Sequence, residues 1–276
     1  MAFNRIVELY VGPEGQPGVK ITGLKVEFDV LKNIKEGFGK AEISVYNLKD
    51  SLVQQYSKTD NVVSLNLGYT DEGSRTAFYG YMGRHHHTRN GVDTIWKIEA
   101  YDGALNVVER NGAYTFGTST PVLSIVTKLI SDLGYPLGAP LPDISQNYAN
   151  GWAFIGKVSK GLTKILAFVG LKYMIQNGRV IVYSGTEVPA SQLVLSKTTG
   201  MLYAPELLED KADVQGSTSV PKRYKVKSIV YPQAVPGTIV TLQSDIANGQ
   251  FKIESAHFYG DNWDGDFMLE SEVVAV

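Results

Sequence analysis

Hydrophobic and polar residues alternate along much of the first hundred positions. In residues 23–33 (GLKVEFDVLKN) every second residue up to Val30 is apolar, and charged residues stand between them. Residues 40–48 (KAEISVYNL) and 61–69 (NVVSLNLGY) repeat the pattern. A period of two is typical of a strand with one buried face. Between them, residues 49–57 (KDSLVQQYS) carry apolar side chains at helical spacing, which predicts a short helix in an otherwise β-rich domain.

The period changes in the middle of the chain. Residues 118–136 (TSTPVLSIVTKLISDLGYP) carry apolar side chains three and four positions apart, which predicts a helix. We expect Ser119 or Thr120 to cap its start, Pro121 to occupy its first turn and Gly134 to end it.

A second helix is predicted at residues 159–170 (SKGLTKILAFVG), where the apolar residues again fall on one side. It leads into residues 171–184, LKYMIQNGRVIVYS, which contain the pair Asn177-Gly178. Asn-Gly between two apolar runs is a strong signal for a two-residue β-hairpin turn. The middle of the chain is therefore expected to be a small α+β unit.

The last part returns to alternation, in YKVKSIVY, GTIVTLQS, GQFKIESAHFYGD and DFMLESEVV. We therefore expect a mainly β (α+β) protein made of three domains. Residues 1–112 form the first β-domain, residues 113–200 an α+β insert, and residues 201–276 a second β-domain.

Composition narrows the classes of function. The 276 residues carry a formal net charge of −2 and no cysteine. Absence of cysteine excludes disulfides, thiolate metal sites and cysteine nucleophiles, and the charge gives no basic signature of nucleic-acid binding. We see no secretory signal pattern and no apolar run long enough for a membrane span, so we expect synthesis in a cytoplasm.

Three of the four histidines stand together in YMGRHHHTRNGVDTIWKI, residues 81–98. Asn90 and Gly91 predict a two-residue turn that places Arg89 opposite Val92.

In such a hairpin His85 and His87 lie on the face of Trp96, and His86 lies on the other face. The three imidazoles therefore cannot meet at one ion within one subunit. We interpret them as strand residues; the alternative is a metal site built on His85 and His87 with a third ligand from elsewhere.

The fourth histidine, His257, is expected to share a strand face with Phe251 and Ile253, as a packed core or interface residue. The following GDNWDGDF, residues 260–267, has three aspartates. We interpret it as a turn between two strands, because its glycine spacing does not fit a helix-flanked calcium loop.

Motifs of catalysis are missing from the sequence. There is no Gly-x-Ser-x-Gly elbow, no Walker-type phosphate loop and no His-Glu-x-x-His helix. We therefore expect a protein that is not an enzyme, without catalytic residues and without a cofactor.

Several segments resemble one family in the order in which they occur. The segment GLKVEFDVLKNIKEGFGKAEISVYNL is similar to the opening of tailed-bacteriophage baseplate hub proteins, and YGYMGRHHHTRNGVDTIWKIEAYDG to its continuation. The stretches PVLSIVTKLISDLG, KYMIQNGRVIVY and the terminal segment from PGTIVTLQS to ESEVV are similar as well. The resemblance runs over nearly the whole chain.

The resemblance implies an architecture and a function. The two β-domains would be tube-like β-barrels, and three subunits would form a ring with six barrels around a channel. Such a homotrimer joins the sixfold tail tube to the threefold central spike or fibre, and DNA passes through it without sequence-specific binding. Expected partners are a tail tube or distal tail protein, the spike or fibre and other baseplate proteins. The expected location is the tail tip of the virion.

Residues on the polar face of the first two predicted barrel strands are our candidates for contacts with neighbouring subunits or for the lining of the channel. They are Lys25, Glu27, Asp29, Glu42, Ser44 and Tyr46.

The alternative function is a carbohydrate- or receptor-binding protein of the tail tip, since exposed aromatic rings stack on sugars. The three tryptophans, Trp96, Trp152 and Trp263, are dispersed along the chain.

Overall fold

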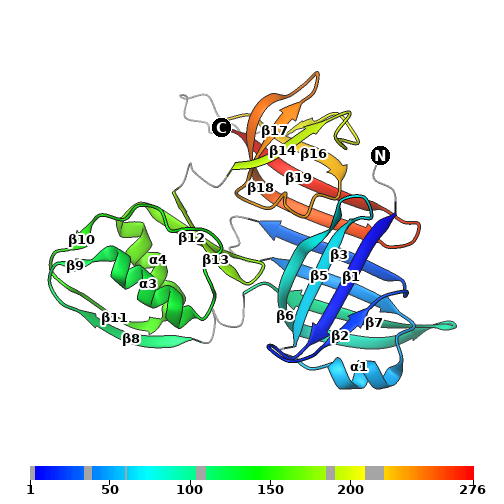
Figure 1. Ribbon diagram of the computed structural model, residues 1–276, viewed down its shortest axis with the longest axis horizontal. Helices are drawn as coiled ribbons and strands as arrows, with labels where there is room; N and C mark the ends of the chain where they lie inside the picture. Colours follow the sequence, from blue (N-terminus) through cyan, green and yellow to red (C-terminus); the bar gives the residue numbers. More distant parts are fainter. Residues whose placement is uncertain (1–3, 34–38, 60, 104–109, 185–189, 209–220) are drawn as a thin grey trace.

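The protein is a β-rich body with an α+β insert that projects to one side (Figure 1). A computed structural model describes residues 4–33, 39–59, 61–103, 110–184, 190–208 and 221–276. The predicted mainly β class is confirmed. No helix within these ranges is long and apolar enough to cross a membrane.

The N-terminal lobe of the body contains seven strands and one helix. They are β1 (Arg5–Gly12), β2 (Val19–Ile21), β3 (Val26–Asn33), β4 (Lys40–Tyr46), α1 (Asp50–Tyr56), β5 (Val62–Tyr69), β6 (Gly73–Asn90) and β7 (Asp93–Tyr101). Their spatial order is β3-β4-β7-β6-β5-β1-β2, and every pairing is antiparallel. The predicted alternation is confirmed in β3, β4 and β5, where every second side chain is buried.

The C-terminal lobe contributes six strands. They are β14 (Ala190–Ser196), β15 (Glu206–Leu208), β16 (Arg223–Ile229), β17 (Ile239–Gln243), β18 (Asn248–Asp261) and β19 (Phe267–Ala275). The path β15-β16-β19-β18 continues into β3, because β18 and β3 pair antiparallel from Ser255↔Asn33 to Asp261↔Glu27. The two lobes therefore belong to one 13-stranded sheet, and a single hydrophobic core lies under both.

The insert lies between the lobes in sequence and has a core of its own. Its elements are β8 (Asn111–Phe116), β9 (Thr120–Pro121), α3 (Val122–Leu133), β10 (Asn147–Tyr148), β11 (Trp152–Lys157), α4 (Val158–Phe168), β12 (Leu171–Gln176) and β13 (Arg179–Ser184). The helices pack on each other over a core that also takes in Tyr81 of β6. The hairpin predicted at Asn177-Gly178 is confirmed, with both residues at positive φ (51° and 68°).

The end of α3 was predicted better than its start. Gly134 ends the helix in the left-handed conformation, as expected. The predicted Ser119 or Thr120 cap is wrong: Pro121 directly precedes the helix, and no side chain of the described residues caps it. Thr120 pairs with Tyr148 in the short β9–β10 ladder, so the chain enters the helix from a strand.

The boundary expected at residue 200 also differs from the structure. The strand β14 was assigned to the insert, but it pairs in parallel with β17 of the C-terminal lobe. The sheets of the insert end at Ser184, the last residue of β13. A parallel partner far away in the sequence leaves no local signal, which is why the alternating pattern could not locate this boundary.

A β-bulge in β18 corrects the prediction for His257. Ile253 pairs with Val273 and Ser255 pairs with Glu272, so Glu254 is an extra residue in the strand. The extra residue reverses the alternation, and His257 lies on the face opposite to the buried Ile253. His257 contacts Asp29 of β3, with 3.0 Å between Nε2 and Oδ1.

The β6–β7 hairpin turns one residue later than predicted. Asn90 pairs with Asp93 across Gly91 and Val92, so Arg89 faces Thr94 instead of Val92. Gly91 alone has positive φ (61°), which suits a turn with glycine at its first central position. Each histidine pairs with the residue of β7 that lies two positions beyond the predicted partner. A shift of two keeps side chains on the same face, so the predicted faces of the three histidines are confirmed.

Candidate functional surface

The polar side of the 13-stranded sheet is the most extended feature that both lobes share. We call polar sheet face the solvent-facing residues of β7, β4, β3, β18, β19 and β16. It consists of Lys97, Glu99, Lys40, Glu42, Ser44, Tyr46, Glu27, Asp29, His257, Tyr259, Glu270, Glu272, Lys225 and Lys227, with Lys25 at its border.

The six residues singled out from the sequence meet on this face. Glu27 lies opposite Ser44, and Asp29 lies opposite Glu42. Tyr46 donates a hydrogen bond to Glu27, with 2.8 Å from Oη to Oε2. The structure thus brings Glu27, Asp29, Glu42, Ser44 and Tyr46 together on β3 and β4, with Lys25 directly before β3. Their contact with a subunit or a lumen stays a prediction.

Three acidic residues lie side by side across the N-terminal lobe. Glu42 is opposite Asp29 on one side and Glu99 on the other. Like charges directly opposite each other are destabilising, and Lys40, beside the central Glu42, reduces this cost. Lys40 Nζ lies 2.5 Å from Glu42 Oε1, and His257 contacts Asp29.

The C-terminal half of the face is more evenly paired. Glu270 lies 2.9 Å from Lys225 and 3.3 Å from Lys227. Burial opposes ionisation of Glu270, but the hydrogen bonds from both lysines lower its pKa below the usual value. A mixed, paired surface here contrasts with the acidic row on β3, β4 and β7.

The loop between β18 and β19 fixes the border between the lobes. Asp261 accepts hydrogen bonds from the backbone N–H of Trp263 (2.7 Å) and Gly265 (3.2 Å). Arg5 and Lys25 approach the same carboxylate, at 3.7 and 3.9 Å. The predicted turn is confirmed, and backbone donors occupy the carboxylate that a calcium loop would use as its first ligand.

The histidine run gives no geometry for a metal. His85 pairs with Ile98 and His87 with Trp96 on β7, and His87 Nε2 lies 3.7 Å from Asp50 Oδ1 of α1. Across the described residues, no group of three or more His, Cys, Asp or Glu side chains is arranged to hold an ion. We keep the interpretation of these residues as part of a strand.

A buried polar group at the base of the insert was missed by the sequence reasoning. Lys32 and Asp102 are 3% and 0% exposed. A signal for Lys32 was present, because it stands in phase with the apolar Val26, Phe28 and Val30 of the same strand. A charged residue on the apolar side of a strand requires a buried partner.

Comparison with known proteins identifies the fold. No family model matches the sequence, and no curated protein sequence is similar to it. The structure is similar to the tail protein from Neisseria meningitidis MC58 (TM-score 0.65, 12% identity, 99% of this chain and 97% of that one). It is also similar to the 43 kDa tail protein of prophage MuSo2 from Shewanella oneidensis (TM-score 0.66, 10% identity, 98% of each chain).

A third similar structure comes from a secretion system. The E. coli c3393 protein, described as a component of the type VI secretion system with structural similarity to the T4 tail proteins gp27 and gp5, matches with TM-score 0.61 and 13% identity. The match covers 99% of this chain and 75% of that one. The chain therefore has the fold of phage tail proteins, and the resemblance inferred from sequence is confirmed at the level of the fold.

Proposed function

We propose that the protein is a structural hub of a phage tail. Three copies form a ring that joins the sixfold tail tube to a threefold central spike or fibre. The observation that carries this proposal is the likeness in fold to tail proteins over 98–99% of the chain. A homotrimer, a position at the baseplate in the virion and assembly in the host cytoplasm belong to the proposal.

The continuous sheet supports the proposal, because it offers one polar face across both lobes. Three copies would place six lobes around an axis with this face toward the channel. The acidic row of Asp29, Glu42 and Glu99 would then repel phosphates, so DNA would pass without binding. The partners would be a tail tube or distal tail protein, the spike or fibre and further baseplate proteins.

The proposed role is structural, without catalysis or a cofactor. The polar sheet face supports this, because the acids described above are paired with cations of the same face or lie in a solvent-exposed row. The similarity to a secretion-system component is compatible with the same role in a related machine.

The test is the mass of the purified protein by light scattering, followed by negative-stain imaging. A trimer with a central hole supports the hub. A protein that stays monomeric, also when mixed with tube and spike proteins from the same source, contradicts it.

A cysteine at position 44 tests the orientation of the polar sheet face, since the chain has no other cysteine. In a trimer of the Ser44→Cys variant, a small maleimide should react, whereas a maleimide attached to a protein-sized carrier should be excluded from the channel. Ala153→Cys, at an exposed position of the insert, is the matched control and should react with both. Protection from the small reagent would place Ser44 in a subunit interface instead.

One observation favours the alternative of a receptor- or carbohydrate-binding tail protein. Trp263 is 62% exposed, whereas Trp96 and Trp152 are buried. Binding to a host glycan that is lost in Trp263→Ala would support this second candidate. Equal binding, or none, in both proteins would remove the support that Trp263 gives.

A further inference from the structure

The insert is fastened to the body at the tip of its β12–β13 hairpin. The turn residues Asn177 and Gly178 reach past the insert and enter a socket in the body. The walls of the socket come from the ends of β3 and β7 and from the first half of β6. Figure 1 shows the hairpin lying between the insert and both lobes.

A buried carboxylate lies at the centre of the socket. Asp102 Oδ2 accepts the backbone N–H of Asn177 at 2.5 Å, and Oδ1 accepts the backbone N–H of Gly178 at 3.0 Å. Asp102 itself is held by its own N–H, which donates to the carbonyl of Gly39 at 2.9 Å. A single ionised group thus binds both consecutive donors of the turn, and hydrogen bonds to a charged acceptor are the stronger kind.

Lys32 completes the charge balance. Its Nζ donates to Asn177 Oδ1 at 2.6 Å, and the same amide group of Asn177 donates to the carbonyl of Thr76 at 3.3 Å. Burial lowers the pKa of Lys32 to about 8, and Asp102 opposes this shift. Burial also raises the pKa of Asp102, against Lys32 and the two backbone donors. Each charge is therefore buried with a partner of opposite sign.

The socket is tight as well as polar. A β-carbon on Gly178 would lie 2.7 Å from Cδ1 of Tyr79, and Gly178 has a φ of +68°. A β-carbon on Gly103 would lie 2.5 Å from Ile175. Gln176 adds a link to the C-terminal lobe by donating to the carbonyl of Pro236 at 3.3 Å. The hairpin tip therefore contacts both lobes.

We propose that Asp102 and Lys32 form a latch that sets the orientation of the insert relative to the body. Insert and body have separate hydrophobic cores, so loss of the latch leaves both folded. Tyr81, which packs in the insert core, then remains as an apolar pivot. The inference concerns the chain itself and stands apart from the proposed trimer. It assigns Asp102 the role of a positioning residue for whatever the insert contacts.

The absence of cysteine makes the orientation measurable. Ala153→Cys in the insert and Thr88→Cys on the β6–β7 hairpin are both at exposed positions. Spin labels attached to the two cysteines report the distance between insert and body by double electron–electron resonance. In Asp102→Asn, an NH2 group replaces one carboxylate oxygen. That group donates hydrogen bonds, so one of the two backbone N–H groups of the turn loses its acceptor and faces another donor. We expect the distance distribution to broaden and its centre to move, while circular dichroism and the amide protection of α3 stay as in the parent protein.

Two further variants act on the latch without touching the carboxylate. Gly178→Ala places a methyl group against Tyr79 and should broaden the distribution in the same way, and Lys32→Met removes the balancing charge and should do so as well. Asp143→Asn removes an exposed carboxylate of the insert and should change nothing.

Two results would overturn the latch. One is an unchanged distribution in folded Asp102→Asn and Gly178→Ala proteins. The other is joint loss of structure in insert and body in all three latch variants, since the group would then hold the fold and not the orientation.

Discussion

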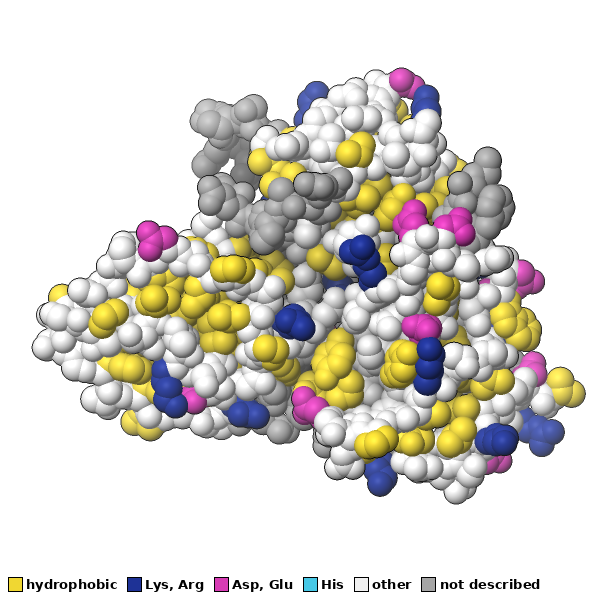
Figure 2. Space-filling model, viewed as in Figure 1, with side chains coloured by type: hydrophobic (Ala, Val, Ile, Leu, Met, Phe, Trp, Pro, Cys, Tyr) yellow, Lys and Arg dark blue, Asp and Glu magenta, His cyan; other side chains and the backbone are white. Residues whose placement is uncertain are grey.

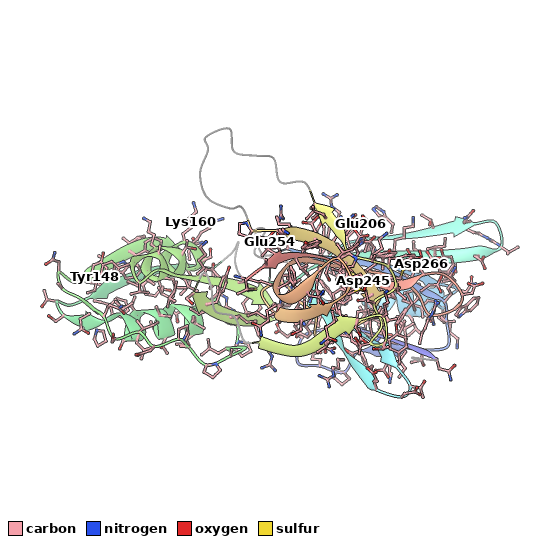
Figure 3. All side chains as sticks on the ribbon, turned by 90° about the horizontal axis from the view of Figure 1, so that it is seen from above. Tyr148, Lys160, Glu206, Asp245, Glu254 and Asp266 are labelled. Carbon is pink, nitrogen blue, oxygen red and sulfur yellow. The ribbon has the colours of Figure 1, made fainter. Side chains whose placement is uncertain are left out.

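The body and the insert of this chain carry net charges of opposite sign. Between residues 110 and 184 seven Lys and Arg stand against two Asp, a net charge of +5, and residues 144–184 contain no acidic residue at all. Since the whole chain carries −2, the remaining residues carry −7. Several charges of the body form ion pairs between strands, as Glu270 does with two lysines, whereas basic residues of the insert such as Lys160 lie on its surface without a neighbouring acid in sequence (Figure 3).

The difference follows from the secondary structure. A sheet puts neighbouring strands within reach of each other, so that Glu270 meets both Lys225 and Lys227. The helix α4 carries Lys160 and Lys164 one turn apart with no acid nearby in sequence. Apolar side chains also gather on the visible face of the insert in Figure 2. The body is thus net acidic, with ion pairs between its strands and an acidic row on β3, β4 and β7, and the insert is net basic.

The largest effect is expected when a buried side chain is truncated in either of the two hydrophobic cores. Phe258→Ala in the body should lower the free energy of unfolding by about 3–5 kcal/mol, and Leu129→Ala in the insert by about 2–5 kcal/mol, because both side chains are fully buried. Hydrogen exchange by residue is the measurement. If the cores are independent, Leu129→Ala loses protection only in the insert; equal loss in β18 would break the comparison.

A smaller effect is expected at the border of the lobes. Asp261→Ala leaves the backbone donors of Trp263 and Gly265 without their acceptor, which should cost about 1–3 kcal/mol. Denaturant unfolding measures the loss. Asp264→Ala, an exposed acid of the same loop, is the control, and an equal loss in both would show that the loop acts through its overall charge.

A pH dependence should mark the junction between body and insert. The pKa of Lys32 is about 8 in the folded protein, against 10.5 for an exposed lysine. Unfolding therefore takes up a proton between these values, so this group makes stability rise as the pH rises from about 8 to 10.5.

Lys32→Met should remove that contribution. Denaturant unfolding of both proteins at several pH values gives the slope of the free energy of unfolding against pH. The same slope in both proteins would contradict the lowered pKa of Lys32.

The smallest effect is expected on the polar sheet face. His257→Ala removes a half-exposed contact with Asp29, and the free energy of unfolding should change by no more than about 0.2–1 kcal/mol. Thermal unfolding of both proteins is the measurement. A change of several kcal/mol would show that His257 and Asp29 are much less exposed in solution than they are in the structure of the single chain.

Alternation of apolar residues was enough to predict β3, β4 and β5, and their helical spacing was enough to predict α3 and α4. These patterns could not predict features that are set by distant partners or by a single residue. The bulge at Glu254 reversed the faces of β18; its local mark is the change of the apolar residues from odd positions (Phe251, Ile253) to even ones (Ala256, Phe258), which the prediction for His257 did not take into account. The parallel partner of β14 leaves no local signal.

Two Asn-Gly pairs show the same limit. In the insert both Asn177 and Gly178 adopt positive φ and form the turn, as predicted. In the body only Gly91 does so, and Val92 becomes the second turn residue. For the candidate surface, the strand period placed the six residues on one face correctly. The socket residue Asp102 was missed because its partners come from the insert, some 75 residues away.

The bulge in β18 also marks one place where the strand can lose a residue without moving its apolar side chains. Phe251 and Ile253 are buried before it, and Ala256 and Phe258 after it, so odd positions change to even ones across Glu254. Deleting Glu254 would give a uniform strand in which all four of these apolar side chains stay on the buried face. The deletion should therefore cost little beyond the ion pair of Glu254 with Arg223, whereas deletion of Lys252 would put Phe251 out of phase with Ile253.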